Sequence, residues 1–257
     1  MSPLEAIAIG LAGLAAGTIN TVVGSGTLIT FPALLAFGVP PVTANVSNTI
    51  GLVPGSVSGA LGYRRELEGQ RARILRIGVA SLIGGVLGGV LLLVLPDGAF
   101  STIVPVLVGL GIVLVVFQTR IQAWVAGRRE GRELSASDAL TGPWWVWPAV
   151  LLAGVYGGYF GAAQGVLLMG LLGVGIPESL QRLNALKNVL AAIVNAVAGL
   201  LFAFVADVDW RIVALIGVGS VIGGQVGATV GRRLPSGVLR AVIVVVGVVA
   251  LAVFLLS

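Results

Sequence analysis

The sequence predicts an all-α polytopic membrane protein with about eight transmembrane helices in two homologous halves, each with a broken or re-entrant segment after its first span. Three observations lead to this prediction: an apolar composition, a series of long apolar runs and an internal repeat. Of the 257 residues, 57% are hydrophobic and 10% are charged, whereas a soluble domain carries about a quarter charged residues. Too little polar surface is available for a water-soluble globule, so the chain belongs in a membrane.

Eight apolar runs approach the length of about 20 residues that a membrane-spanning helix needs. They cover residues 4–23, 42–62, 77–95, 99–119, 144–163, 183–205, 212–231 and 238–256. Two further apolar pieces, 27–38 and 164–175, are too short to cross and directly follow the first and fifth spans. They predict re-entrant or broken segments, which membranes tolerate only where protein or a water-filled cavity surrounds them.

Basic residues in the connectors predict the orientation. The connectors 63–76 and 120–138 hold nine of the fifteen basic residues, so the positive-inside rule places both in the cytoplasm. Eight crossings then put both termini in the cytoplasm and put Arg182 and Lys187 outside. If one of the short pieces crossed the membrane, the second half would invert. The predicted location is the inner (cytoplasmic) membrane, in a multi-pass arrangement.

An internal duplication relates the two halves. FPALLAFGVP (31–40) matches LMGLLGVGIP (168–177) at an offset of 137, and IGVASLIGGVLGG (77–89) matches IGVGSVIGGQVGA (216–228) at an offset of 139. The predicted divisions are a first transmembrane repeat, a cytoplasmic connecting loop and a second transmembrane repeat, at residues 1–120, 121–142 and 143–257. Duplicated halves that are interrupted at corresponding places indicate a transporter's binding site.

The two interruptions carry residues suited to anion binding. Glycines let the backbone turn and approach a ligand closely, hydroxyls cap the next helix, and helix N-termini favour anions. The candidates are Gly24, Ser25, Gly26 and Thr27 in the first half, and Gly161 and Gln164 in the second. The alternative is that glycines only allow close helix packing, which we favour for Gly84 and Gly223 but not for the two breaks.

Asparagines and one lysine complete the candidate site. The asparagines lie in or beside predicted spans, at Asn20, Asn45, Asn48, Asn184 and Asn188. Each could instead be an interhelical hydrogen-bonding tie. Lys187, the only lysine, either faces a cavity or a bound anion or extends to the nearby membrane interface.

Several classes of activity are excluded or disfavoured. The chain has no cysteine and no histidine, which excludes disulfides, thiol chemistry and the usual zinc and haem ligand sets. All ten acidic residues lie at the ends of apolar runs or between them, which argues against a carboxylate active site. We expect no enzyme activity, no catalytic residue, no metal and no cofactor. The expected partners are a small anionic substrate and the lipid bilayer, not nucleic acid, and a homodimer stays open.

Two stretches and one short motif carry a family resemblance. NTVVGSGTLITFPALLAFGVPPVTANVSNT (20–49), GVYGGYFGAAQGVLLMGLLGVGIPESLQRLNALKN (154–188) and DVDW (207–210) resemble the TauE/SafE family of sulfite-exporter-like transporters. The resemblance implies transport of small sulfur-containing anions, such as sulfite or sulfoacetate, without ATP, in a direction that differs among family members. For this chain we expect export. Ala162, Ala163 and Gln164 stand where family members often carry more glycine. A channel-like pore and a carrier of a different small anion are the alternatives.

Overall fold

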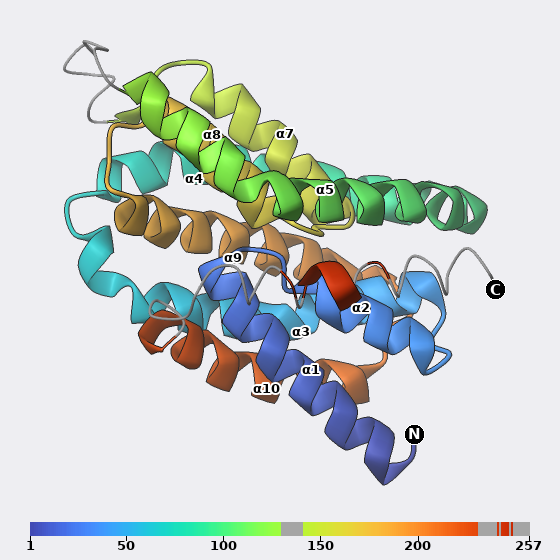
Figure 1. Ribbon diagram of the computed structural model, residues 1–257. Coiled ribbons are helices and arrows are strands. Elements are labelled where there is room, and N and C mark those ends of the chain that lie inside the picture. Colours follow the sequence, from blue (N-terminus) through green and yellow to red (C-terminus); the bar gives the residue numbers. More distant parts are fainter. Residues whose placement is uncertain (130–140, 231–240, 242, 247, 249–257) are drawn as a thin grey trace.

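The computed structural model describes residues 1–129, 141–230, 241, 243–246 and 248, and every regular element among them is a helix (Figure 1). The elements are α1 (Pro3–Val22), α2 (Thr27–Ala36), α3 (Pro41–Gly62), the short 3₁₀ helix η1 (Arg64–Leu67), α4 (Arg71–Val94), α5 (Asp97–Arg129), α7 (Val146–Tyr159), α8 (Gln164–Gly175), α9 (Leu180–Val205) and α10 (Trp210–Thr229). Within the described part, five helices are long and apolar enough to cross a membrane. The all-α polytopic prediction is confirmed. Most of the predicted span 238–256, and the loop residues 130–140, lie outside the described residues.

Local sequence signals set several helix starts. Ser2 and Glu5 form a capping box at the start of α1, with Pro3 in its first turn. Ser179 caps α9, and the Asp209 carboxylate accepts from the backbone N–H groups of Arg211 and Ile212 to cap α10. Each cap satisfies donors that the first helical turn leaves without a partner.

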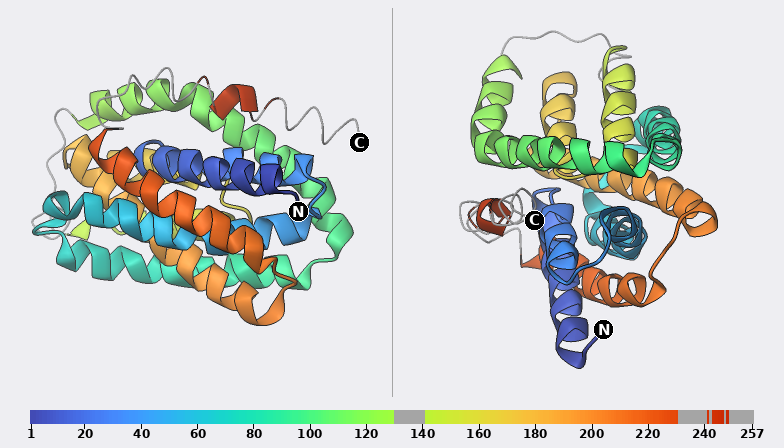
Figure 2. Two further views of the ribbon diagram at one scale, coloured as in Figure 1. Left: turned by 90° about the horizontal axis from the view of Figure 1, so that it is seen from below. Right: turned by 90° about the vertical axis from the view of Figure 1, so that its right-hand side faces the viewer.

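Glycines bring two pairs of helices into backbone contact. Helix α1 packs along α10, and α4 packs along α7 (Figure 2). A Cβ atom at Gly223 would collide with the backbone of Leu14, and one at Gly84 with the backbone of Leu151. The packing interpretation of these glycines is therefore confirmed, because only a residue without a side chain allows such close helix contact.

The predicted fifth span does not cross. Helix α7 has 14 residues, or about 21 Å at 1.5 Å per residue, which is shorter than the hydrocarbon core of about 30 Å. Helix α8 then returns to the end where α7 began, since a Cβ atom at Gly175 would meet Val146 and one at Gly142 would lie 3.4 Å from Ile176. Helices α7 and α8 form a re-entrant hairpin.

This hairpin changes the orientation of everything that follows it. Arg73 pairs with Glu178 at 3.1 Å, and Arg182 donates to the Glu68 carbonyl at 3.0 Å. The start of α9 therefore lies beside the 63–76 connector, at what we call the basic end. The prediction that Arg182 and Lys187 lie on the opposite side from this connector is wrong, because the α7–α8 hairpin removes one crossing.

Helices α1 and α2 form a second hairpin, which starts at the end of the molecule opposite the basic end. The Asp209 N–H donates to the Ser47 hydroxyl at 3.0 Å, so α10 and α3 begin together, away from the basic end. Helix α1 runs parallel to α10, since Gly13 packs on Ile216 and Gly227 packs on Thr18. The α1–α2 hairpin thus starts where α3 begins, and the N-terminus lies at the end opposite the basic connector. The predicted placement of the N-terminus beside that connector is also wrong.

Two boundaries at the basic end differ from the prediction. Helix α4 begins at Arg71 and α5 continues to Arg129, whereas the apolar runs there start at 77 and stop at 119. Helices continue beyond the apolar run because charged residues outside a hydrocarbon core still form backbone hydrogen bonds.

Candidate functional site

The two chain breaks meet inside the protein. The Gly165 N–H donates to the Gly24 carbonyl at 3.0 Å, and a Cβ atom on either residue would collide with the backbone of the other. The residues 24–27 and 162–164 are buried. The structure therefore brings together the two segments that the duplication indicated, in a conformation closed to solvent.

Both breaks end their first helix in the same way. The N–H groups of Val23 and Gly24 share the Ile19 carbonyl, and those of Phe160 and Gly161 share the Tyr156 carbonyl. The chain then turns at a glycine in the left-handed region, with φ of 90° at Gly24 and 74° at Gly161. Glycine adopts this conformation at little cost, which explains its presence at these two positions.

The second break carries one more unusual backbone conformation. Ala163 has φ of 61°, a region that costs an L-residue with a side chain about 1–2 kcal/mol. The Tyr156 hydroxyl donates to the carbonyl of the neighbouring Ala162. This bond helps to hold the turn that contains Ala162 and Ala163.

Unfilled hydrogen-bond donors gather where the breaks meet. Among the described residues, the backbone N–H groups of Ser25, Gly26 and Thr27 have no acceptor, and neither do those of Ala162 and Ala163. Ser25 is 1% exposed and Gln164 is 4% exposed, and the Ser25 hydroxyl and the Gln164 amide nitrogen are buried without a partner. Because a buried donor without a partner costs about 1–3 kcal/mol, these groups suit an incoming acceptor.

Asparagines of α3 hold both hairpins. The Asn45 amide donates to the carbonyl of Tyr159, at the end of α7, at 3.0 Å. Asn48 accepts from the Thr30 hydroxyl at 2.5 Å and donates to the Thr27 hydroxyl at 3.4 Å. Asn45 thus binds the second hairpin and Asn48 the first.

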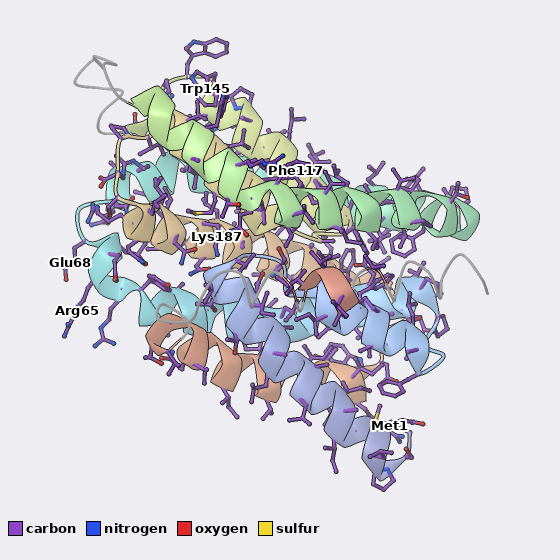
Figure 3. The ribbon with its side chains drawn as sticks, viewed as in Figure 1. Met1, Arg65, Glu68, Phe117, Trp145 and Lys187 are labelled. Atoms are coloured by element: carbon purple, nitrogen blue, oxygen red, sulfur yellow. The ribbon has the colours of Figure 1, made fainter. Side chains whose placement is uncertain are left out.

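Polar side chains of α9 converge on the end of α1. Asn184 and Asn188 donate to the Thr21 carbonyl at 3.1 and 3.3 Å. The Lys187 ammonium donates to the carbonyls of Asn20 and Thr21 at 3.0 and 3.2 Å. Lys187 is 0% exposed and lies inside the molecule, away from Arg65 and Glu68 at its surface (Figure 3). The alternative that it extends to the membrane interface is wrong.

The remaining two candidates also lie near the breaks. The Asn20 amide donates to the Ser56 hydroxyl at 3.3 Å, which also accepts from Asn195 at 3.3 Å. The Gln164 side chain lies against Gly157, where a Cβ atom would collide with it. Gly157 corresponds to Asn20 in the repeat, so each half places one amide group in this region, from different positions.

The sequence did not predict an aromatic cluster that lies beside the breaks. The Phe31 ring packs edge-on against Phe160 with centroids 5.1 Å apart, and Phe100 lies 6.2 Å from Phe160 and 5.9 Å from Tyr159. All four rings are buried. Single aromatic residues in apolar runs give no sequence signal for such a cluster, which needs α2, α5 and the second break to meet.

The described residues contain no cluster of side chains that could hold a metal ion. No three acidic side chains gather there in a way that could hold a metal ion. The candidate site consists of backbone amides, hydroxyls, carboxamides and one ammonium group.

The family model described as sulfite exporter TauE/SafE matches residues 9–255, nearly the whole chain. The chain belongs to this family. A probable membrane transporter protein from Sinorhizobium sp is 27% identical over 251 residues, which cover 96% of this chain and 90% of that protein. The probable membrane transporter protein YfcA of Escherichia coli K12 is 26% identical, over 97% and 89% of the two chains.

A third relative has the same kind of name. A probable membrane transporter protein from Haemophilus influenzae is 25% identical over 237 residues, covering 91% of this chain and 88% of that protein. With the family match and the long apolar helices, these relatives identify the TauE/SafE chain as a multi-pass membrane transporter and not an enzyme.

Proposed function

We propose that this TauE/SafE protein is a secondary transporter that exports small sulfur-containing anions, such as sulfite or the organosulfonate sulfoacetate, across the cytoplasmic membrane. One observation carries the proposal: unfilled donors from two chain breaks meet in a buried position. Five backbone N–H groups, the Ser25 hydroxyl and the Gln164 amide have no acceptor among the described residues. The family resemblance supplies the substrate class, which the geometry does not select.

The donor set suits an oxyanion. A sulfonate or sulfite group presents three oxygens, so it accepts several hydrogen bonds at once from donors on different segments. The N-termini of α2 and α8 add their positive dipole ends, which favour negative charge. The buried donors would replace the hydration shell of the anion. Except for Lys187 they carry no full charge, so they would bind the anion weakly enough for it to leave.

Hairpins from opposite ends provide a route for alternating access. The α1–α2 hairpin starts at the end opposite the basic connector and the α7–α8 hairpin at the basic end, and the two touch through the bond between Gly165 and Gly24. A movement of one hairpin away from the other would open the anion site toward one side only. The aromatic cluster of Phe31, Phe100, Tyr159 and Phe160 would have to separate during the same movement, because Phe31 lies on α2 and Phe160 in the second break.

Anion flux in proteoliposomes tests this proposal. Sulfite and sulfoacetate flux should saturate, respond to imposed voltage or pH gradients, and accelerate when the opposite side contains unlabelled substrate. Ser25→Ala should weaken apparent affinity by about tenfold, since a hydrogen bond to a charged group contributes about 1.5–3 kcal/mol. Thr229→Val, at an exposed position on α10, is the matched control and should leave affinity unchanged.

Two results would redirect the proposal. Flux without saturation or acceleration by substrate on the opposite side would identify a channel-like pore. Flux of carboxylates or inorganic anions in place of sulfur oxyanions would identify a carrier of a different small anion.

A further inference from the structure

The end of α1 leaves two backbone carbonyls to be filled from outside the helix. In a continuous helix, the carbonyls of Asn20 and Thr21 would accept from the N–H groups of Gly24 and Ser25. The Gly24 N–H donates instead to Ile19, and the Ser25 N–H has no acceptor among the described residues. The C-terminal end of a broken helix also carries the negative end of the helix dipole.

Lys187 fills this position. Its ammonium group donates to both carbonyls, at 3.0 and 3.2 Å, and the side chain is fully buried. In transporters with broken helices, carbonyls at such a helix end coordinate the coupling cation while the opposing N-terminus holds the anion. The geometry here reproduces that arrangement with a cation that is covalently part of the protein.

No carboxylate neutralises this charge within the described part of the chain. The ion pairs found there join Glu178 to Arg73 and Arg182 at the basic end. Helices α3 and α8 contain no charged residue, and the only charged residue of α1 is Glu5, in its first turn. The ammonium is therefore compensated only by carbonyl dipoles, and a positive charge remains close to the donors of residues 25–27.

The second break has no such cation. Asn48 occupies the position that corresponds to Lys187 at the offset of 139, and it binds Thr27 and Thr30 of α2 in place of a helix end. Within the described ranges, the end of α7 receives a side-chain donor only from the neutral Asn45 amide. Cation binding is thus a property of one break, and it is not a general requirement for ending a helix in this fold.

We infer that the Lys187 ammonium is a tethered cation that occupies the cation position of the α1 break, so that anion transport needs no free cation there. Lys187 acts as a positioning residue, through the end of α1, and supplies the charge that favours an anion at residues 25–27. The role of Lys187 in flux rests on the proposed anion transport. The occupancy of the end of α1 by a cation does not, and it is tested separately.

Cation replacement in proteoliposomes is the first test. Wild-type flux should be unchanged when Na⁺ is replaced by N-methyl-D-glucamine at constant ionic strength. Lys187→Ala should lose about tenfold or more of this flux, because buried carbonyls are left unpaired. Methylammonium, which is small enough for the vacated space, should restore flux to Lys187→Ala. Lys187→Met is the matched control, because its side chain fills the space without a charge and should not be rescued.

Thermal unfolding of the purified protein is the second test and needs no substrate. Methylammonium at ten times its dissociation constant should raise the unfolding temperature of Lys187→Ala by about 3 °C, and should leave wild type and Lys187→Met unchanged. If Lys187→Ala is recovered folded only with methylammonium present, the inference is supported.

Three results would overturn the inference. They are a Na⁺ requirement in the wild type, full flux of Lys187→Ala in N-methyl-D-glucamine, and equal responses of Lys187→Ala and Lys187→Met to methylammonium. If Lys187→Ala does not fold, the Na⁺ replacement in wild-type proteoliposomes still decides whether transport needs a free cation. Wild-type protein that moves none of the anions would refute the proposed function, while the unfolding measurements would still decide whether a cation occupies the end of α1.

Discussion

The two breaks share their backbone geometry but differ in how their helix ends are stabilised. Each ends its first helix with two N–H groups on one carbonyl and turns at a glycine with positive φ. The end of α1 then receives an ammonium and two carboxamides from α9, whereas the end of α7 receives one carboxamide from α3. Equivalent backbones therefore carry different charge.

The breaks also differ in the side chain that begins the following helix, which is Thr27 of α2 in the first break and Gln164 of α8 in the second. Thr27 in the first break is bound to Asn48, while Gln164 in the second break has a free amide nitrogen. Each break nevertheless keeps one buried neutral side-chain donor, the Ser25 hydroxyl in the first and the Gln164 amide nitrogen in the second. This difference teaches that the same backbone turn can be combined with different charges and different side-chain partners.

The largest effect is expected from placing a second buried charge on α3, at the position that corresponds to Lys187 at the offset of 139. Asn48→Lys introduces a buried ammonium with no carboxylate nearby, which should lower the free energy of unfolding by about 3–5 kcal/mol. Asn48→Leu, which removes the same hydrogen bonds without adding charge, should cost clearly less. Unfolding by denaturant in detergent measures both. Equal stability of the two variants would mean that the protein tolerates a second buried cation at this position of α3.

The glycine turns should differ in sensitivity. Gly24→Ala places a Cβ atom into the Gly165 backbone as well as requiring positive φ, so it should cost about 2–4 kcal/mol. Gly161→Ala brings the Cβ atom within 2.9 Å of one carbonyl and should cost less. Gly38→Ala isolates the conformational cost, because Gly38 has φ of 77° and open space around it. A different order of unfolding temperatures would contradict the close approach of the two breaks.

The free donor of the second break should matter for binding more than for stability. Gln164→Leu removes a nitrogen that has no partner, so it should weaken anion binding by about tenfold or more with little loss of unfolding temperature. Thr27→Val should change both quantities, because Thr27 also holds Asn48. Anion titrations followed by thermal shift separate these effects. A large destabilisation by Gln164→Leu without loss of binding would assign that side chain to packing alone.

The smallest effect is expected at the basic end, outside both breaks. Burial of Glu178 opposes its ionisation, but hydrogen bonds from Arg182 and Arg73 outweigh this and lower the pKa of the carboxyl below its ordinary value of 4.5. A lowered pKa in the folded state gives stability that is present above the ordinary pKa and is lost as the pH falls through the lowered one.

Glu178→Gln should therefore reduce stability by about 1 kcal/mol at neutral pH. The difference from wild type should shrink as the pH falls below 4.5. In a Glu178→Gln background, the three Gly→Ala variants should keep the same order of unfolding temperatures, since Glu178 contacts neither break. Thermal unfolding as a function of pH measures both, and a difference that grew on acidification would contradict the ion pairing.

Helix positions and the two breaks could be predicted because they depend on local sequence. Apolar runs fix where helices form, and Gly24 and Gly161 mark turns that other residues adopt only with strain. The path of the chain could not be predicted in the same way. The run 144–163 has the length of a span, and composition does not reveal that its helix stops at Tyr159 and that the chain turns back.

The residues of the candidate site carry sequence signals, but their contacts do not. Its asparagines, Ser25, Gln164 and Lys187 were identified as polar residues that an apolar chain retains only for a reason. Their partners include backbone carbonyls of Thr21 and Tyr159, which carry no sequence signal because every residue has a carbonyl. The aromatic cluster escaped notice for a related reason, since its rings come from separate segments.

By itself, the sequence determined that this protein is an apolar helical transporter of the TauE/SafE family with two interruptions in its helical runs. Composition, period and glycine placement are local properties, so the linear chain displays them. The tertiary structure alone decided that the hairpins enter from opposite ends, that Gly24 meets Gly165, and that Lys187 binds the end of α1. These contacts join residues more than 130 positions apart, and their energy depends on burial and distance, which exist only after the helices have packed.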